Sequence, residues 1–161
     1  MCQYLPPPAR VSRTTDLGDS VLTLTIVAAG LKQSFQLVEA GNLRKQESDR
    51  LTALATELRR CGVPVEEQPD GLTLGTAAVF RRARIQTYQD HRIAMSFAVM
   101  ATRDAMGDGQ PWLTIEDPEC VNKTYPNFFE TLESIARQST TAAGQTHQPV
   151  VLTPNGVPVF A

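Results

Sequence analysis

The strongest periodic pattern of hydrophobic positions in this chain follows residue 50. Apolar side chains recur there at i, i+3, i+4 and i+7, the spacing of one helix face: Leu51, Leu54, Ala55 and Leu58. Glu47 and Asp49 precede this segment and two arginines close it, as the helix dipole favours. Gly62 then provides a residue that commonly ends a helix. The pattern therefore predicts an amphipathic helix that ends just before Gly62.

Shorter runs of apolar residues predict strands and two further helices. The predicted strands are Ser34–Val38, Val63–Glu67, Leu72–Leu74, Arg81–Thr87 and Trp112–Ile115. The second and third flank Pro69-Asp70-Gly71, which is a hairpin turn signal. A helix from Ile93 to Ala101 is apolar almost all round and is expected to be buried. A last helix, Tyr125 to Arg137, is expected to turn Phe128, Leu132 and Ile135 inward.

The segment from residue 20 to residue 29 is ambiguous. Its Leu and Ile residues alternate with Thr, which by itself predicts a strand. Asp19 ahead of the run is a good helix N-cap, however, and Ala28 and Ala29 favour a helix. Both interpretations stay open on pattern alone.

The order of these elements predicts an α+β fold. Helices and strands mix without the strict βαβ alternation of a doubly wound sheet. Composition divides the chain into an irregular segment (1–15), a folded region (16–138) and a small, polar, linker-like tail (139–161). Within the tail, Pro154-Asn155-Gly156 is a turn signal that can form a hairpin.

Composition and charge exclude several classes of protein. With 161 residues, 42% hydrophobic and 20% charged, the chain is expected to be a soluble globular domain. A net charge of −2 argues against nucleic acid or a membrane surface as the main partner. The sequence shows no signal peptide and no apolar stretch long enough to span a membrane. Its three cysteines lack CxxC spacing, so we expect reduced thiols, a cytoplasmic location and no metal site.

Charged and amide side chains cluster at two predicted helix starts. One cluster is the run Asn42 to Arg50, the other is Asp90-His91-Arg92, and Lys123 follows later. For any one of these cations, solvated surface charge is the ordinary explanation. Arg50 and Arg92, however, lie in first turns, where the helix dipole disfavours cations. A bound anion would explain that placement, since guanidinium groups pair with carboxylates and phosphates.

The acidic candidates are individually ambiguous. Glu47 beside Arg50 could form a simple helix pair, or it could be a carboxylate tuned for proton transfer. His91 between Asp90 and Arg92 has the same two interpretations, and Asp19 alone would most often be a helix cap. Spacing does not decide between these alternatives.

Three motifs in register resemble the 5-enolpyruvylshikimate-3-phosphate (EPSP) synthase family. They are Asn42-Leu-Arg-Lys-Gln-Glu-Ser-Asp-Arg50, Thr87-Tyr-Gln-Asp-His-Arg-Ile-Ala-Met95 and Cys120-Val-Asn-Lys-Thr-Tyr-Pro-Asn-Phe-Phe129, with Asp16-Leu-Gly-Asp-Ser-Val-Leu-Thr-Leu24 upstream. The resemblance covers residues 10–138 and the C-terminal portion of the family's enzyme. It implies an α+β fold of βαβαββ units and makes Val21–Ala29 a helix.

The resemblance also implies a reaction and roles for particular residues. The family transfers the enolpyruvyl group of phosphoenolpyruvate to the 5-hydroxyl of shikimate 3-phosphate, releases phosphate, and uses no metal or organic cofactor. Asp19 resembles the carboxylate that orients and deprotonates the hydroxyl, and Glu47 the acid–base group for the methylene proton. The other residues implied in the site are the anion clamp of Arg50, Arg92 and Lys123, the supporting His91, and two contacts to shikimate 3-phosphate, Asn42 and Gln46.

Two departures from the family pattern bear on activity. Gln46 stands where the family usually has a lysine, and the preceding Lys45 is expected to point elsewhere. The family's N-terminal half, with an essential lysine, an arginine and a serine-rich pocket, does not resemble any part of this chain. We therefore expect no activity from the chain alone. A non-catalytic domain, a half that needs a complementing N-terminal chain, and a relative acting on UDP-N-acetylglucosamine remain as alternatives.

Overall fold

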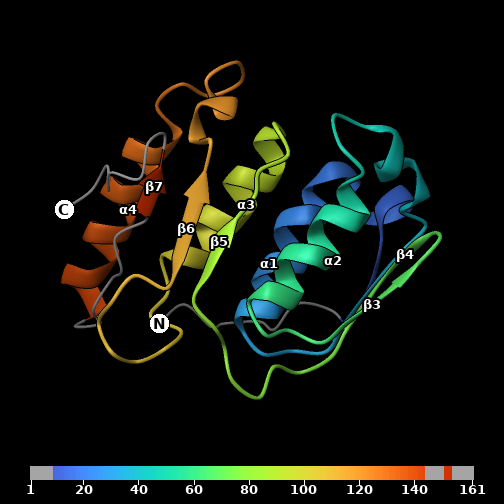
Figure 1. Cartoon of the computed structure of the whole chain (residues 1–161), viewed down its shortest axis with the longest axis horizontal. Helices are drawn as coiled ribbons and strands as arrows, with labels where there is room; N and C mark the ends of the chain where they lie inside the picture. Colours follow the sequence, from blue (N-terminus) through green and yellow to red (C-terminus); the bar gives the residue numbers. More distant parts are fainter. Residues whose placement is uncertain (1–8, 144–150, 154–161) are drawn as a thin grey trace.

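The first six elements form one βαβαββ unit. The computed structural model describes residues 9–143 and 151–153 (Figure 1). The unit consists of β1 (Arg10–Ser12), α1 (Val21–Gly30), β2 (Phe35–Val38), α2 (Arg50–Arg60), β3 (Val65–Gln68) and β4 (Gly71–Leu74). The sheet order is β1-β2-β4-β3, with β1 parallel to β2 and both neighbours of β4 antiparallel to it. This arrangement confirms the α+β fold class.

The turn between β3 and β4 requires glycine. The hairpin predicted at Pro69-Asp70-Gly71 is present, and Asp70 also accepts a hydrogen bond of 2.6 Å from the main-chain N–H of Gly41. A Cβ atom at Gly71 would lie 2.0 Å from the carbonyl oxygen of Leu37 in the neighbouring strand. Only glycine allows the two main chains to approach so closely.

The remaining elements build a second, parallel sheet. They are β5 (Ala83–Ile85), α3 (His91–Ala101), β6 (Leu113–Glu116), α4 (Phe128–Ala143) and β7 (Val151–Thr153). The sheet order is β5-β6-β7 and both pairings are parallel. Figure 1 shows α4 on one side of this sheet and α3 between it and the first unit.

Helices α1 and α3 form the centre of the molecule. They pack against each other, and Thr23 Oγ1 lies 3.0 Å from Ser96 Oγ across the contact. Both helices are buried on most of their surface, which confirms the expectation for residues 93–101. Within α1, the Thr25 hydroxyl donates to the carbonyl of Val21 (2.7 Å). That bond lets threonine occupy a buried helical position, so the helix implied by the family resemblance is present and the strand pattern was misleading.

Four expectations need correction. Residues 10–12, expected to be irregular, form β1, which is too short to show a period. The last helix begins at Phe128 because the residue before Pro126 disfavours helical backbone. It continues to Ala143, beyond the expected start of the tail. Ile135, expected to face inward, is 56% exposed. The hairpin about 154–156 lies outside the described residues.

Candidate functional site

The predicted site residues come from four segments that meet at one end of the molecule. They lie at the starts of α1, α2 and α3 and in the loop after β6, all toward the top of Figure 1. Asp49 caps α2 by accepting from the N–H of Thr52 (3.0 Å), and Asp90 caps α3 by accepting from the N–H of Arg92 (3.0 Å). Each cap starts a helix where a charged side chain of the site follows.

Arg50 and Asp90 form a buried ion pair at the centre of this region. Arg50 Nε donates to Asp90 Oδ2 (2.7 Å) and Nη2 to Oδ1 (3.2 Å), and Ser48 Oγ donates to the same carboxylate (3.0 Å). The side chains are 2% and 0% exposed. Burial favours the neutral acid, but the hydrogen bonds and charge of Arg50 outweigh it, so the pKa of Asp90 lies below its usual value.

Asp19 lies among three guanidinium groups. Its carboxylate accepts from Arg13 Nη2 (2.8 Å) and lies 3.6 Å from Arg50 Nη1 and 3.7 Å from Arg92 Nε. Ser20, not Asp19, is the N-cap residue of α1, and neither side chain accepts a capping hydrogen bond from the main chain of that helix. The Asp19 side chain is therefore a partner of cations. Arg50 Nη1 is buried and has no hydrogen-bond partner within the described part of the chain.

Glu47 links His91 and Lys123. Its Oε2 lies 2.9 Å from His91 Nδ1, and its Oε1 accepts from Lys123 Nζ at 2.6 Å. Partial burial favours the neutral acid, but the hydrogen bonds from Lys123 and His91 outweigh it and lower the pKa of Glu47. In the sequence Lys123 looks like an isolated surface lysine. The fold places it against Glu47, although the two residues are 76 positions apart in the sequence.

A pocket of about 130 Å³ opens beside these charges. Its lining combines two charged residues, one histidine, two apolar side chains and three hydroxyl side chains: Asp19, Leu22, Thr23, His91, Arg92, Met95, Ser96 and Thr124. Six of the eight predicted site residues thus lie in this pocket or in the ion pairs next to it. The arrangement can bind a small anion and exchange protons with it.

The remaining two predicted residues lie apart from the ion pairs. Asn42 and Gln46 are exposed, in and just after the short helical segment Gly41–Lys45. Arg44 in the same run has a structural role, because it donates to Asp49, Glu67 and the carbonyl of Gln68. The crowded run therefore divides into residues that hold α2 to the β3–β4 hairpin and residues, Glu47 and Arg50, that pair with side chains in or next to the pocket.

Sequence reasoning missed two participants. The sequence pattern marks Asp90 only as a neighbour of His91, although a carboxylate at an N-cap can also meet a cation from another helix start. Arg13, within a segment expected to be irregular, donates to Asp19 from a single π-helical turn, Arg13–Leu17. No local pattern marks a contact that depends on how β1 leads into α1.

A divalent cation does not suit this arrangement. Among the described residues, Glu47, Asp90 and His91 offer ligand atoms that lie within 4.8 Å of one another. Lys123 and Arg50 already neutralise two of them at 2.6 and 2.7 Å. A metal ion would have to displace both cations, so the absence of a metal cofactor stays our prediction.

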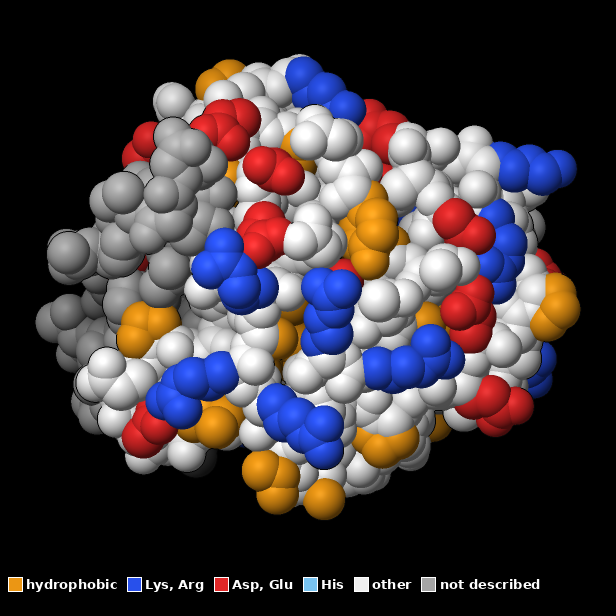
Figure 2. Space-filling view, in the orientation of Figure 1, with side chains coloured by type: hydrophobic (Ala, Val, Ile, Leu, Met, Phe, Trp, Pro, Cys, Tyr) orange, Lys and Arg blue, Asp and Glu red, His pale blue; other side chains and the backbone are white. Residues whose placement is uncertain are grey.

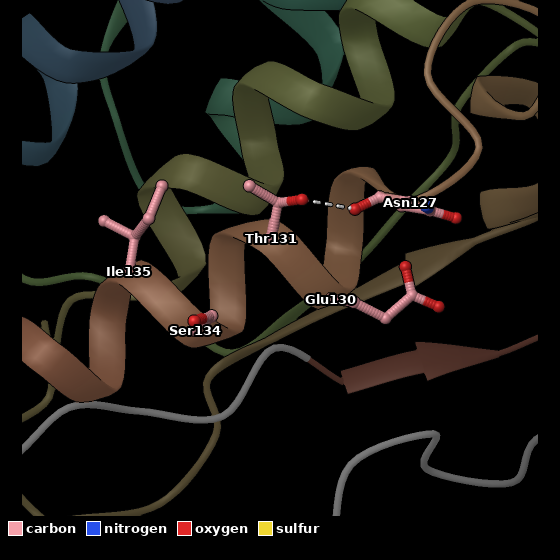
Figure 3. Close-up of a pocket in the computed structure, with 5 residues that line it drawn as sticks. All are labelled: Asn127, Glu130, Thr131, Ser134 and Ile135. Carbon is pink, nitrogen blue, oxygen red and sulfur yellow. Dashed lines mark hydrogen bonds between the residues drawn. The ribbon is translucent and has the colours of Figure 1, made fainter.

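Two other surface features are separate from the site. A shallow hollow of about 570 Å³ follows α4 and is lined by Asn127, Glu130, Thr131, Ser134 and Ile135 (Figure 3). Among the residues whose side chains the structure describes, its lining includes no cation and none of the predicted site residues. At the other end of α2, Lys and Arg side chains gather toward β5, as Figure 2 shows. Exposed arginines in this region include Arg59, Arg60, Arg81, Arg82 and Arg84.

Comparisons with known proteins decide the family. The sequence profile of EPSP synthase (3-phosphoshikimate 1-carboxyvinyltransferase) matches residues 9–132, more than half of the chain. The chain belongs to the EPSP synthase family. The 3-phosphoshikimate 1-carboxyvinyltransferase of Opitutus terrae is 40% identical over 124 residues, which are 77% of this chain and 29% of that protein. The protein of the same name from Sulfurovum sp. is 41% identical over 118 residues, 73% of this chain and 26% of its own length.

A solved structure agrees with this assignment. EPSP synthase from Acinetobacter baumannii has a TM-score of 0.57 and 28% sequence identity over 72% of this chain and 26% of its own. The chain therefore corresponds to between a quarter and a third of the length of the EPSP synthases it matches. No helix in residues 9–143 is long and apolar enough to cross a membrane.

Proposed function

We propose that this chain supplies the C-terminal share of an EPSP synthase site. In the reaction, the 5-hydroxyl of shikimate 3-phosphate adds to C2 of phosphoenolpyruvate while a proton joins C3, and loss of phosphate and of a C3 proton then gives the enol ether. The observation that carries the proposal is the convergence of Arg50, Arg92 and Lys123 on two carboxylates beside one pocket. Family membership adds the substrates to that geometry.

The cations are placed to exchange protein carboxylates for substrate anions. Arg92 and Lys123 are about half exposed, and each now lies against Asp19 or Glu47. Phosphoenolpyruvate carries a carboxylate and a phosphate that can take over these contacts. Arg50 stays behind them, and its buried Nη1, 3.6 Å from Asp19 Oδ2, has no hydrogen-bond partner among the described residues. If Asp19 moves, this nitrogen can donate to an anion without first breaking the pair of Arg50 with Asp90.

Substrate binding would also change the acid–base behaviour of Glu47. In the free chain its pKa is held down by hydrogen bonds from Lys123 and His91. If the substrate takes Lys123, that stabilisation of the carboxylate is lost and the pKa of Glu47 rises toward its usual value. The carboxylate then becomes better able to hold the proton that moves to and from C3. Asp19, next to the pocket, is placed to accept the hydroxyl proton.

The extent of the match predicts what the chain does alone. It corresponds to under a third of each EPSP synthase reported above. We expect the 161-residue chain to bind phosphoenolpyruvate weakly and to show no turnover until a complementing N-terminal half is added. We also expect a cytoplasmic location, as for an enzyme of aromatic amino acid biosynthesis.

Calorimetric titration of the chain with phosphoenolpyruvate, with and without shikimate 3-phosphate, tests the proposal. Arg92→Ala should weaken binding about tenfold, since a charge-assisted hydrogen bond is lost. The control is Arg84→Ala, which removes the same charge from an exposed residue of β5 that is not in the pocket lining and that pairs with Glu116. Equal affinities of the two variants for phosphoenolpyruvate would contradict the proposed site. Formation of product by the chain alone would contradict the interpretation that it supplies only part of a site.

A further inference from the structure

The turn that leads into α3 has an unusual main-chain conformation. Tyr88 has φ of 55° and Gln89 has φ of 58°, and the N–H of Asp90 donates to the carbonyl of Thr87 (2.9 Å). Two successive left-handed residues in a four-residue turn define the type I′ family, which normally uses Asn and Gly. Tyr and Gln are disfavoured there, so contacts from the surroundings must hold the turn.

Those contacts come from Glu57, a carboxylate that the proposed reaction does not use. Its side chain is fully buried, although it lies on α2 outside the site. Its Oε1 accepts from the Tyr88 hydroxyl (2.7 Å), and its Oε2 accepts from the N–H of Gln86 (3.3 Å) and lies 3.3 Å from Arg60 Nη1. One buried carboxylate thus binds both the segment before the turn and the first left-handed residue in it.

Helix α2 contacts the turn through two side chains. Arg50 and Glu57 are separated by seven residues, two helical turns, so they lie on the same face of the helix. Arg50 holds Asp90 at the end of the turn, and Glu57 holds Tyr88 near its start. The next two residues after Asp90 are His91 and Arg92, which contact Glu47 and Asp19.

We propose that Glu57 and Tyr88 are positioning residues that hold this left-handed turn and thereby place His91 and Arg92 at the anion pocket. The inference rests on the proposed function for its consequence in binding. Tyr88 is 41% exposed, so the hydrogen bond of its hydroxyl to Glu57 contributes more to holding the residue than burial of its ring does. Burial and the neighbouring Glu57 raise the pKa of Tyr88 to about 12, so the hydroxyl keeps the proton that it donates.

Amide hydrogen exchange tests the positioning without reference to any substrate. Tyr88→Phe should raise the exchange rates of the Asp90 and Gln86 amides about tenfold, because a hydrogen bond to a charged group is lost. Amides of α1 should not change. The control is Tyr125→Phe, which removes a hydroxyl that donates to Thr131 at 3.1 Å, outside the turn. Unchanged exchange at Asp90, or an equal rise throughout α1, would overturn the proposal.

A second variant separates strain from simple loss of contact. Gln89→Gly removes the penalty of the left-handed conformation, since glycine adopts positive φ freely. In the Tyr88→Phe background it should restore most of the Asp90 protection and of the affinity for phosphoenolpyruvate, which Tyr88→Phe should lower about threefold to tenfold. Failure of Gln89→Gly to rescue either property would overturn the positioning role.

The two measurements, hydrogen exchange and affinity for phosphoenolpyruvate, also distinguish the inference from the function on which it rests. If the unmodified chain does not bind phosphoenolpyruvate, the proposed function fails, while the exchange rates at Asp90 still decide whether Glu57 and Tyr88 hold the turn. If Tyr88→Phe accelerates exchange but leaves the affinity for phosphoenolpyruvate unchanged, the turn is held without serving the pocket, and the proposal is wrong.

Discussion

Asp90→Asn is the most informative single substitution in this chain. It replaces one carboxylate oxygen by an NH2 group, which turns the carboxylate into an amide and keeps the shape of the side chain. The amide oxygen can still cap α3 in the place of Oδ1, which accepts from the N–H of Arg92, so the helix start should survive. The amide NH2 group then takes the place of Oδ2, which accepts from Arg50 Nε and Ser48 Oγ. What the change removes is the negative charge that compensates Arg50, whose side chain is only 2% exposed.

The cost follows from leaving a cation buried without its partner. Removing one member of a buried ion pair typically costs about 3–5 kcal/mol. Asp19 Oδ2, 3.6 Å from Arg50 Nη1, compensates part of the charge, so we expect the lower end of that range. For a chain of this size a loss of about 3 kcal/mol lowers the melting temperature by roughly 6–12 °C.

Thermal unfolding followed by circular dichroism measures this loss. The control is Asp108→Asn, because Asp108 forms a surface ion pair with Arg82 at 2.5 Å and both side chains are nearly half exposed. Exposed pairs contribute little, so the control should melt with the unmodified chain. A drop for Asp90→Asn no larger than that of the control would refute the assignment of a buried, stabilising pair.

The pH dependence gives an independent check. The pKa of Asp90 is lowered in the folded chain, so its contribution is fully present above the ordinary value of 3.8 and is lost as the pH falls through the folded-state pKa. The stability difference between the unmodified chain and Asp90→Asn should therefore be constant near neutral pH and shrink below pH 3.8. A difference that grew on acidification would contradict this.

Three further predictions concern other parts of the chain. Gly71→Ala should cost at least about 2 kcal/mol in thermal melts, since its Cβ would meet a main-chain oxygen, while Gly107→Ala, at positive φ in open space, should cost about 1 kcal/mol. Burial raises the pKa of Cys61 to about 12, so mass spectrometry should find it unmodified by iodoacetamide at pH 8 in the native chain, and the partly exposed Cys120 should be modified before Cys61. Gln46→Lys should tighten calorimetric binding of shikimate 3-phosphate about twofold to fivefold, because it adds an exposed cation at the position where the family usually has a lysine.

Helices with one exposed face could be predicted from the chain, and those without one could not. In α2 the apolar stripe and the terminal charges agree, and the helix lies where the pattern placed it. In α1 the burial of Thr25 next to Ile26 removes the contrast between faces, so the pattern of apolar and polar positions no longer follows the helix. Strand β1 escaped prediction because three residues cannot show a period.

For the site, the residue types could be predicted but not their pairings. Arg50 and Arg92 stand in first helical turns, where the helix dipole disfavours cations, and both lie beside Asp19. That Asp90 is the main partner of Arg50 depends on how α2 packs beside α3, which no local spacing contains. The left-handed Tyr88 was equally hidden, because tyrosine is not a residue that predicts such a turn.

Strand β7 has a consequence for how the second sheet can be completed. It pairs with β6 in parallel through main-chain atoms, and it lies beyond residues 9–132, the part that matches the family. Main-chain pairing depends little on side chains, so an extended segment of different sequence could replace β7 on this edge of β6. The second sheet is therefore completed by a strand from outside the family-matching region, through contacts that do not involve the pocket at the helix starts.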